Sequence, residues 1–306
     1  MPHTHEFVVG PAQQGRLDRV IAAQTGLARA RVVRLIADGA VLVDGDQASK
    51  SLSVRPGMRV RVIEPDPVGP PVGEAIEVKV VHEDPHLMVI AKPAGLVTHP
   101  APGHTGGTLV NALLARSEPP AGGASERPGI VHRLDVGTSG LMVIAKSEEA
   151  HGLLVEAMSE RRIERTYLAL IEGGLDTDTA TVDAPIGRSA RHRKKMAIVA
   201  GGKPAVTRFT VLERHRDTSL VEAKPETGRT HQIRVHLQAA GHPVVGDPVY
   251  GKDRKLARAL GLRRPFLHAT RLSFRHPITG EQLDLTEPLP AELIEALARA
   301  RAGTAE

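Results

Sequence analysis

The chain has 306 residues, enough for about two domains, and its 41% apolar and 25% charged residues indicate a folded, water-soluble protein. It contains no cysteine, which excludes disulfides, thiolate metal sites and a cysteine nucleophile. No apolar run approaches the ~20 residues that span a bilayer, and the first residues lack a secretory signal pattern. We therefore expect a cytoplasmic protein with no membrane partner.

The net charge of +5 is concentrated near the N-terminus. Residues 1–63 contain nine Lys/Arg against five Asp/Glu, so this segment alone carries +4. Such an excess is typical of a part that meets a polyanion such as RNA. An ordinary solvated basic surface accounts for the charge equally well.

The first 63 residues predict a small α+β domain. Apolar residues at helical spacing predict helices over 16–26 and 27–39. An apolar strand then runs into the dipeptide Asp44-Gly45, which is a hairpin signal, and residues 58–63 predict a further strand. The following segment, 64–74, has four prolines and no apolar period, so we expect a stiff linker there and a second domain over 75–306.

Residues 16–63 resemble the small RNA-binding domain first described in the fourth protein of the small ribosomal subunit. The resemblance rests on RLD at 16–18, on the arginines of the second predicted helix and on GAVLVDG at 39–45. A helix can align guanidinium groups along a phosphate backbone. The resemblance therefore implies RNA contacts by Arg29, Arg31 and Arg34.

The hexapeptide LMVIAK occurs twice, at 87–92 and 141–146. The residues that flank the two copies differ entirely, which argues against a duplicated domain. An apolar run without polar alternation predicts a strand covered on both faces. We therefore expect two central strands, each emerging at its lysine, Lys92 or Lys146, into the same kind of polar environment.

An aspartate, Asp135, follows the sequence HRL and precedes the glycine-bearing turn VGTSG. Glycines allow a tight turn or the close approach of a ligand, and a carboxylate in such a place can act as a nucleophile or a general base. The alternative is that Asp135 caps a turn and pairs with an arginine, and this segment alone favours that interpretation.

Two other segments favour a catalytic role for Asp135 over a turn-capping one. Residues 226–251 hold a basic run with alternating apolar residues, which predicts a strand with one packed face and one basic face. Residues 161–173 place Tyr167 at the head of an apolar strand beside basic residues. Tyr167 is thus a candidate stacking platform for a base, or else a half-buried core tyrosine.

Long motifs in these segments resemble the RluA/RluD family of ribosomal RNA pseudouridine synthases. They are AKPAGLVTHP, HRLDVGTSGLMVIAK and GRTHQIRVHLQAAGHPVVGDPVYG, within a match from Ala75 to Pro290. The resemblance implies a mixed α/β (α+β) fold with a central, largely antiparallel sheet, and no metal or organic cofactor. The sequence also lacks HExxH, P-loop and GxGxxG motifs.

The resemblance also implies an activity, the conversion of uridine to pseudouridine in RNA after the base has left its stack. Asp135 would be the catalytic carboxylate, as nucleophile or as base, and Arg234 its ion-pair partner, with Arg229 a weaker alternative. Arg133 would occupy the vacated stack and Tyr167 would pack on the base. The implied catalytic residues are Asp135, Arg234 and Tyr167, and the implied substrate-binding residues are His132, Arg133, Arg229 and Leu267.

A non-catalytic RNA-binding or ribosome-assembly factor is the alternative from another class. Such a protein would have no need of a carboxylate among so many cations, so the joint presence of Asp135, Tyr167 and Arg234 favours the enzyme. We expect a monomer that acts on large-subunit (23S) ribosomal RNA in an assembly intermediate, with transfer RNA as the alternative substrate.

Overall fold

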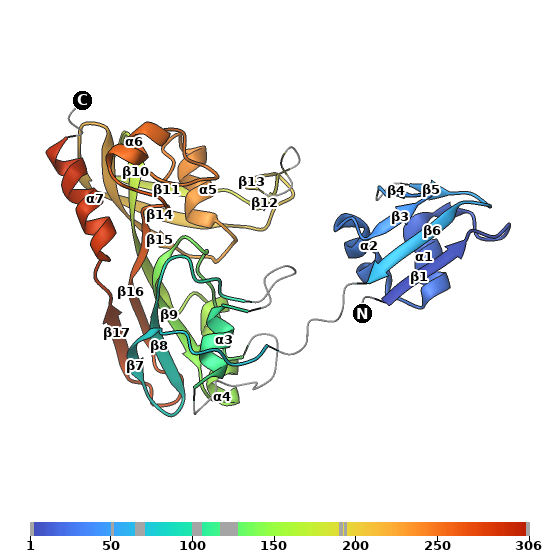
Figure 1. Cartoon of the computed structure of the whole chain (residues 1–306). Coiled ribbons are helices and arrows are strands. Elements are labelled where there is room, and N and C mark those ends of the chain that lie inside the picture. Colours follow the sequence, from blue (N-terminus) through green and yellow to red (C-terminus); the bar gives the residue numbers. More distant parts are fainter. Residues whose placement is uncertain are drawn as a thin grey trace. The chain divides into compact units, whose positions relative to one another are not determined.

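The chain divides into two compact units, Met1–Gly69 and Pro70–Glu306 (Figure 1). The computed structural model describes residues 3–49, 52–64, 71–99, 106–116, 128–189, 192 and 195–303. Most of the predicted linker, residues 65–70, lies outside the described residues. Its last residues pack on the second unit, where the Asn111 side-chain amide donates to the Val72 carbonyl at 2.7 Å.

In its described residues, the N-terminal unit contains two helices and a four-stranded antiparallel sheet with the strand order β1-β6-β3-β4. Both predicted helices and the hairpin are confirmed. The first helix ends at Gly26, whose φ of +73° only glycine adopts readily, and the hairpin turn uses positive φ at Asp44 and Gly45. The elements are α1 (Leu17–Thr25), α2 (Arg29–Ala37), β1 (His3–Val8), β3 (Val41–Val43), β4 (Asp46–Gln47), β6 (Arg59–Glu64) and the short pair β2 (Gly15–Arg16) and β5 (Ser53–Val54).

The second unit is built on a nine-stranded sheet, as far as the described residues extend. Its order is β11-β14-β15-β10-β16-β9-β8-β7, with β17 beside β16. Strands β9 and β16 run parallel and the other described pairs are antiparallel, so the predicted mixed fold with a largely antiparallel sheet is confirmed. The strands are β7 (Lys79–Glu83), β8 (Leu87–Lys92), β9 (Ser139–Ala145), β10 (Glu164–Glu172), β11 (Thr179–Asp183), β14 (Val206–Arg214), β15 (Thr218–Pro225), β16 (Leu267–Arg275) and β17 (Gln282–Thr286).

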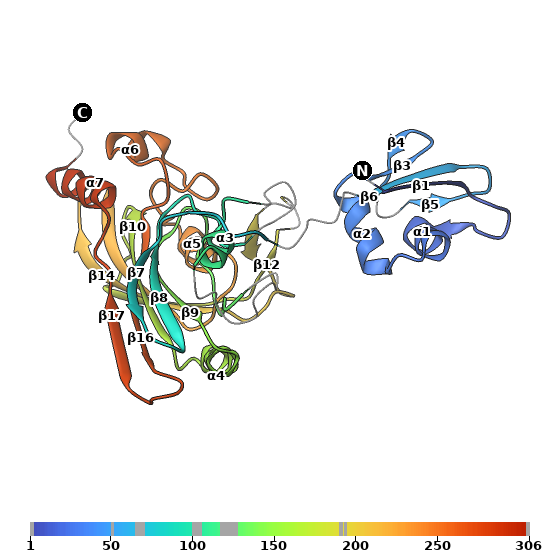
Figure 2. The same cartoon turned by 60° about the horizontal axis from the view of Figure 1, so that its bottom comes forward.

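Helices cover both faces of this sheet. In Figure 2, α3 and α5 lie on one side of the strands and α7 on the other. Among the helices of the described residues, none is long and apolar enough to cross a bilayer. The helices are α3 (Leu109–Leu114), α4 (Glu148–Ser159), α5 (Gln232–Ala239), α6 (Arg254–Ala259) and α7 (Ala291–Ala302), and a separate hairpin joins β12 (Ile186–Arg188) to β13 (Met196–Ile198).

The two LMVIAK segments are the neighbouring strands β8 and β9, which pair antiparallel. Their methionines and isoleucines pack with α3 and α5, and their leucines and valines pack with α4 on the opposite face. The prediction of two strands covered on both faces is confirmed. The expected common environment of their lysines is wrong, because antiparallel pairing puts them at opposite ends. Lys92 donates to the carbonyls of Pro93 and Leu96, whereas Lys146 donates to Glu83.

The expected strand in the basic run of 226–251 is also wrong, because its centre is the helix α5 (Gln232–Ala239). Ile233 and Leu237, one turn apart, pack into the core against the sheet, and Val235 packs in a separate cluster. The helix is buried on nearly every side, so its apolar residues need not follow a helical stripe and instead alternate as in a strand.

Gly140, in strand β9, sits where two backbones nearly touch. Its φ is +114°, and a Cβ there would overlap the backbone oxygen of Ala269 in β16 and lie 2.6 Å from its nitrogen. The glycine therefore permits the parallel pairing of β9 with β16, in which Gly140 lies opposite Ala269.

We expect Gly140→Ala to lower the free energy of unfolding by about 2 kcal/mol or more, through overlap and backbone strain together. The matched control is Gly152→Ala, in the exposed interior of α4, where a Cβ meets nothing within 4 Å. In this control the free energy of unfolding should rise by about 0.5–1 kcal/mol, because alanine has the higher helix propensity. Urea unfolding of both variants checks the pair, and equal stability would contradict the close approach.

Candidate active site

Asp135 lies in the loop that enters β9, and several hydrogen bonds hold this loop in place. The turn closes through the Thr138 amide, which donates to the Asp135 carbonyl at 3.0 Å. Neighbouring segments grip it as well, since Gly95 donates to the Val136 carbonyl at 2.7 Å and the Thr98 hydroxyl to the Leu134 carbonyl at 3.2 Å. The Asp135 side chain is 14% exposed, and its carboxylate points to Arg234.

Arg234 bridges two carboxylates. Its Nε and Nη2 donate to the two oxygens of Asp247 at 2.6 and 2.9 Å, and its Nη1 donates to Asp135 Oδ2 at 2.9 Å. Burial disfavours the cation, but the hydrogen bonds and the charges of both aspartates raise the Arg234 pKa above its ordinary value. The Tyr250 ring covers the guanidinium, 5.1 Å from the ring centroid.

Asp247 is the anchor of this group, because its carboxylate is wholly buried. Besides Arg234 it accepts the backbone N–H groups of Val249 and Tyr250 at 2.8 and 3.1 Å. Burial on its own would raise the Asp247 pKa, but Arg234 and these amides hold it below its usual value. The arginine is therefore fixed from behind, and its remaining nitrogen presents one charge-assisted hydrogen bond to Asp135.

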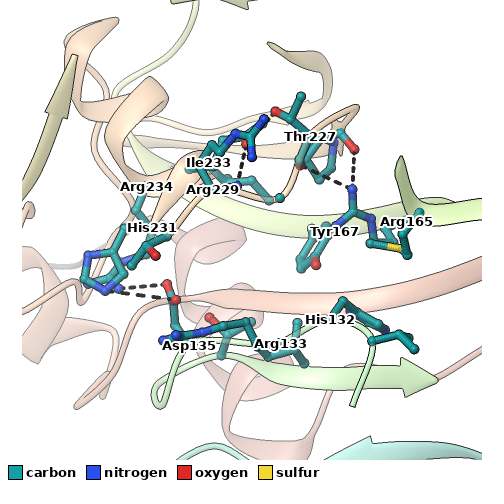
Figure 3. A pocket seen from close by; sticks show the side chains of 18 of the residues that line it. His132, Arg133, Asp135, Arg165, Tyr167, Thr227, Arg229, His231, Ile233 and Arg234 are labelled. Atoms are coloured by element: carbon teal, nitrogen blue, oxygen red, sulfur yellow. Dashed lines mark hydrogen bonds and ion pairs between the residues drawn. The ribbon is translucent and has the colours of Figure 1, made fainter. Parts of the chain in front are cut away.

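A pocket of about 420 Å³ opens beside Asp135. Figure 3 shows Asp135, His231 and Arg234 gathered on one side of Tyr167, with His132 and Arg165 on the other. The pocket is lined from the 130–138 loop, the end of α4, the start of β10 and residues 225–234. The structure thus brings together all seven catalytic and substrate-binding candidates of the second domain, which are His132, Arg133, Asp135, Tyr167, Arg229, Arg234 and Leu267.

These candidates differ in exposure. Tyr167 and Leu267 are buried in the core that also forms the wall of the pocket, and Arg133 is exposed. Burial raises the Tyr167 pKa, so its hydroxyl keeps its proton. Arg229 donates through Nε to the Pro204 carbonyl at 3.0 Å, and the arginine paired with Asp135 is Arg234.

Three buried polar atoms on the pocket lining have no partner among the described residues: His132 Nδ1, Thr138 Oγ1 and Arg165 Nε. His132 Nε2 accepts the Val143 amide at 3.1 Å, which leaves the imidazole proton on Nδ1. Arg165 uses Nη2 for the carbonyls of Pro225 and Thr227, both at 3.2 Å. Two residues of the pocket lining therefore each hold a buried N–H group without a partner among the described residues.

Four residues of the site escaped the sequence analysis: Arg165, His231, Asp247 and Tyr250. Asp247 and Tyr250 lie in the long GDPVYG motif, and their place in that motif was the only signal available. His231 lies in the long motif GRTHQIRVHLQAAGHPVVGDPVYG, with no cue of its own in the sequence. Its distinguishing feature is a backbone φ of +58°, which a sequence does not display.

In the N-terminal unit, the three arginines of α2 have different surroundings. Arg29 donates through Nε to the buried Asp18 at 2.8 Å, Arg31 is partly buried, and the exposed Arg34 has its Nε 4.0 Å from Asp38. The same unit holds the one group of metal-ligating side chains found in the described part of the chain: His3, His5 and Glu64. Glu64 is already hydrogen-bonded to His5 at 2.8 Å.

Comparison with known proteins gives one consistent result. Residues 86–239, about half of the chain, match the family model of RNA pseudouridylate synthase. The chain is 50% identical over 289 residues to an uncharacterized RNA pseudouridine synthase of Chloroflexus aurantiacus, covering 94% of this chain and 90% of that protein. It is 44% identical over 298 residues to ribosomal large subunit pseudouridine synthase D of Pseudomonas aeruginosa, covering 94% and 92%. A solved structure, human RNA pseudouridylate synthase domain containing 1, aligns with a TM-score of 0.57 and 30% identity over 71% of this chain and 86% of its own.

The burial of His132 predicts a dependence of stability on pH. Burial first, and the charge of Arg165 second, lower the His132 pKa from 6.5 to about 3. Between these values the unfolded chain binds a proton that the folded chain does not, so stability falls as the pH falls from 6.5 towards 3. For this group the loss from pH 7 to pH 5 is about 2 kcal/mol.

We expect His132→Gln, which cannot titrate, to lose less stability than the wild type over that interval by about this amount. Urea unfolding followed by circular dichroism at pH 7 and pH 5 measures the difference. Parallel losses in the two proteins would contradict a buried neutral imidazole.

Proposed function

The chain belongs to the RNA pseudouridylate synthase family and is an RNA pseudouridine synthase, and from this premise we propose that it modifies specific uridines of large-subunit ribosomal RNA, with Asp135 as its catalytic carboxylate. The observation that carries the proposal is the ion pair of Asp135 with the doubly held Arg234 at the edge of the pocket. The printed name of the Pseudomonas aeruginosa relative supports the ribosomal target.

The reaction sets requirements that this pocket can meet. The N1–C1′ bond of the uridine breaks, the detached uracil turns, C5 bonds to C1′ and gives up its hydrogen as a proton, and N1 takes up a proton. Arg234 occupies one oxygen of Asp135, Oδ2, so Oδ1 is the oxygen left to act on the substrate as nucleophile or as base. Because Arg234 is itself clamped by Asp247, the carboxylate is presented in a fixed direction.

The pocket also supplies walls and donors for a free uracil. Tyr167 and Leu267 provide buried aromatic and aliphatic surface on which the base can pack. We assign the two N–H groups without a described partner, His132 Nδ1–H and Arg165 Nε–H, to the carbonyl oxygens of uracil, which accept hydrogen bonds. The amino group of cytosine is a donor and would face them unfavourably.

The target base has to leave its stack before it can enter such a pocket. The exposed side chain of Arg133, two residues from Asp135, is the group we assign to the vacated place. In the N-terminal unit we assign RNA contacts to Arg31 and Arg34, and to the nitrogens of Arg29 that Asp18 does not occupy.

Asp135→Asn should abolish turnover, because the amide neither attacks carbon nor takes a proton as the carboxylate does, whereas binding of RNA should persist. The measurement is tritium release from large-subunit ribosomal RNA transcribed with [5-³H]uridine, beside a filter-binding assay of the same RNA. Near-normal release would contradict the assignment. Release by the wild type only from transfer RNA transcripts would move the substrate to that class. Release from neither RNA would contradict both substrate classes.

Tyr167 should act through its ring, worth about 1–3 kcal/mol per stacked base. We expect Tyr167→Phe, which keeps the ring and loses the hydroxyl, to retain most of the single-turnover rate. Tyr167→Leu, which loses the ring, should be slower by about tenfold or more. An inactive Tyr167→Phe would contradict this role and assign proton transfer to the hydroxyl.

A further inference from the structure

His231 holds a backbone conformation that its place in the fold does not explain. Three non-glycine residues among those described have positive φ: Asp44, Arg161 and His231. Asp44 lies in a hairpin turn and Arg161 follows the end of α4, where such a conformation is common. His231 is the N-cap of α5, a position that normally has extended backbone, and its side chain makes no capping hydrogen bond.

A left-handed residue with a side chain costs of order 1 kcal/mol, and such strain persists where the surroundings fix it. Glycine would occupy this position without strain, so the imidazole is the part of the residue that needs explanation. The ring lies on the pocket wall beside Asp135.

Tyr250 is hydrogen-bonded to this imidazole. The Tyr250 hydroxyl oxygen accepts the Met196 amide at 3.0 Å, and His231 Nδ1 lies 2.9 Å from the same oxygen. Among the contacts of this hydroxyl in the described residues, Nδ1 is the atom that can accept its hydrogen, and on that basis we assign the imidazole proton to Nε2. Burial lowers the His231 pKa, in keeping with a neutral ring, and raises that of Tyr250, which keeps its proton.

The Nε2–H faces the oxygen of Asp135 that Arg234 leaves open. His231 Nε2 lies 4.0 Å from Asp135 Oδ1, while Arg234 Nη1 binds Oδ2. This separation is too long for a hydrogen bond, but hydrogen bonds in active sites are often long before substrate binds and tighten in the complex. The two oxygens of one carboxylate thus have separate neighbours, a fixed cation and an oriented neutral donor.

We propose that His231 is a positioning residue, oriented by Tyr250, whose Nε2–H directs the free oxygen Oδ1 of Asp135 toward the bound nucleotide. This inference rests on the proposed catalytic role of Asp135. The hydrogen-bonded series Met196–Tyr250–His231 would then affect the rate of the chemical step and leave RNA affinity unchanged.

Two substitutions at His231 separate positioning from a structural role. An asparagine amide superimposes on the Nδ1 side of the ring, tolerates the left-handed backbone and can still meet Tyr250, but it does not reach Asp135. A glutamine amide extends to the place of Nε2 and can donate to Oδ1. We expect His231→Asn to slow the single-turnover rate about 10- to 100-fold at unchanged RNA affinity, since the lost hydrogen bond is to a charged group. His231→Gln should recover part of that loss.

Tyr250→Phe tests the connection between the two residues. Phenylalanine keeps the ring that covers Arg234 and removes only the hydroxyl that orients His231. It should slow the wild type about tenfold and should not slow His231→Asn any further, because residues acting as a unit are not additive. The matched control is Gln238→Ala, an exposed change on the same helix, which should leave the rate unaltered.

The assay is single-turnover tritium release from the [5-³H]uridine ribosomal RNA transcript with the full chain, beside thermal unfolding of each variant. The inference is overturned if His231→Asn stays within twofold of the wild type or if the two effects multiply. It is also overturned if Asn and Gln are equally slow with a lowered unfolding temperature, which is the structural outcome. Asp135→Asn distinguishes a failure of the proposed function from a failure of this inference. Turnover by Asp135→Asn would contradict the catalytic role of Asp135. An inactive Asp135→Asn together with a normal rate for His231→Asn would contradict only the positioning role of His231.

Discussion

The site depends on one buried cation, the guanidinium of Arg234 held between two carboxylates. A lone buried charge is costly, and this one is tolerated because three of its N–H groups meet carboxylate oxygens and an aromatic ring covers its face. Asp247 is wholly buried and accepts two backbone amides, so its carboxylate is held in one position. The direction of Arg234 is therefore fixed by the interior of the protein, and Asp135 takes its own direction from Arg234.

Much of the scaffold serves to bring these groups together. The loop of Asp135 enters a strand that the bare backbone of Gly140 allows to pair with β16, and β16 begins with Leu267 on the pocket wall. Arg234 comes from a helix buried on nearly all sides, so it has little freedom to move away. Family likeness covers nearly the whole chain, but the pocket itself is built from short segments far apart in sequence, as expected for chemistry carried on a general fold.

Local patterns in the sequence predicted those parts of the fold that local physics decides. Periodicity or turn chemistry predicts three sets of elements: the strands of the two LMVIAK segments, the helices ending near Gly26 and Ala37, and the Asp44-Gly45 hairpin. Helix α5 was missed because burial on all sides removed the helical stripe on which its recognition depends. Likeness to known motifs selected the pocket residues, but Asp247 as a second partner of Arg234 and the left-handed backbone of His231 arise only from tertiary contacts.

The central claim is that the geometry of the guanidinium, beyond its charge, sets the direction of Asp135. Arg234→Lys keeps a cation but removes the planar fork that serves both carboxylates at once. The decisive measurement is the single-turnover rate of this variant on the ribosomal RNA transcript, with folding checked by circular dichroism and RNA affinity by filter binding. The account predicts a loss of about 100-fold or more in a folded protein that binds RNA normally. A rate within a few-fold of the wild type would contradict it, since charge alone would then suffice.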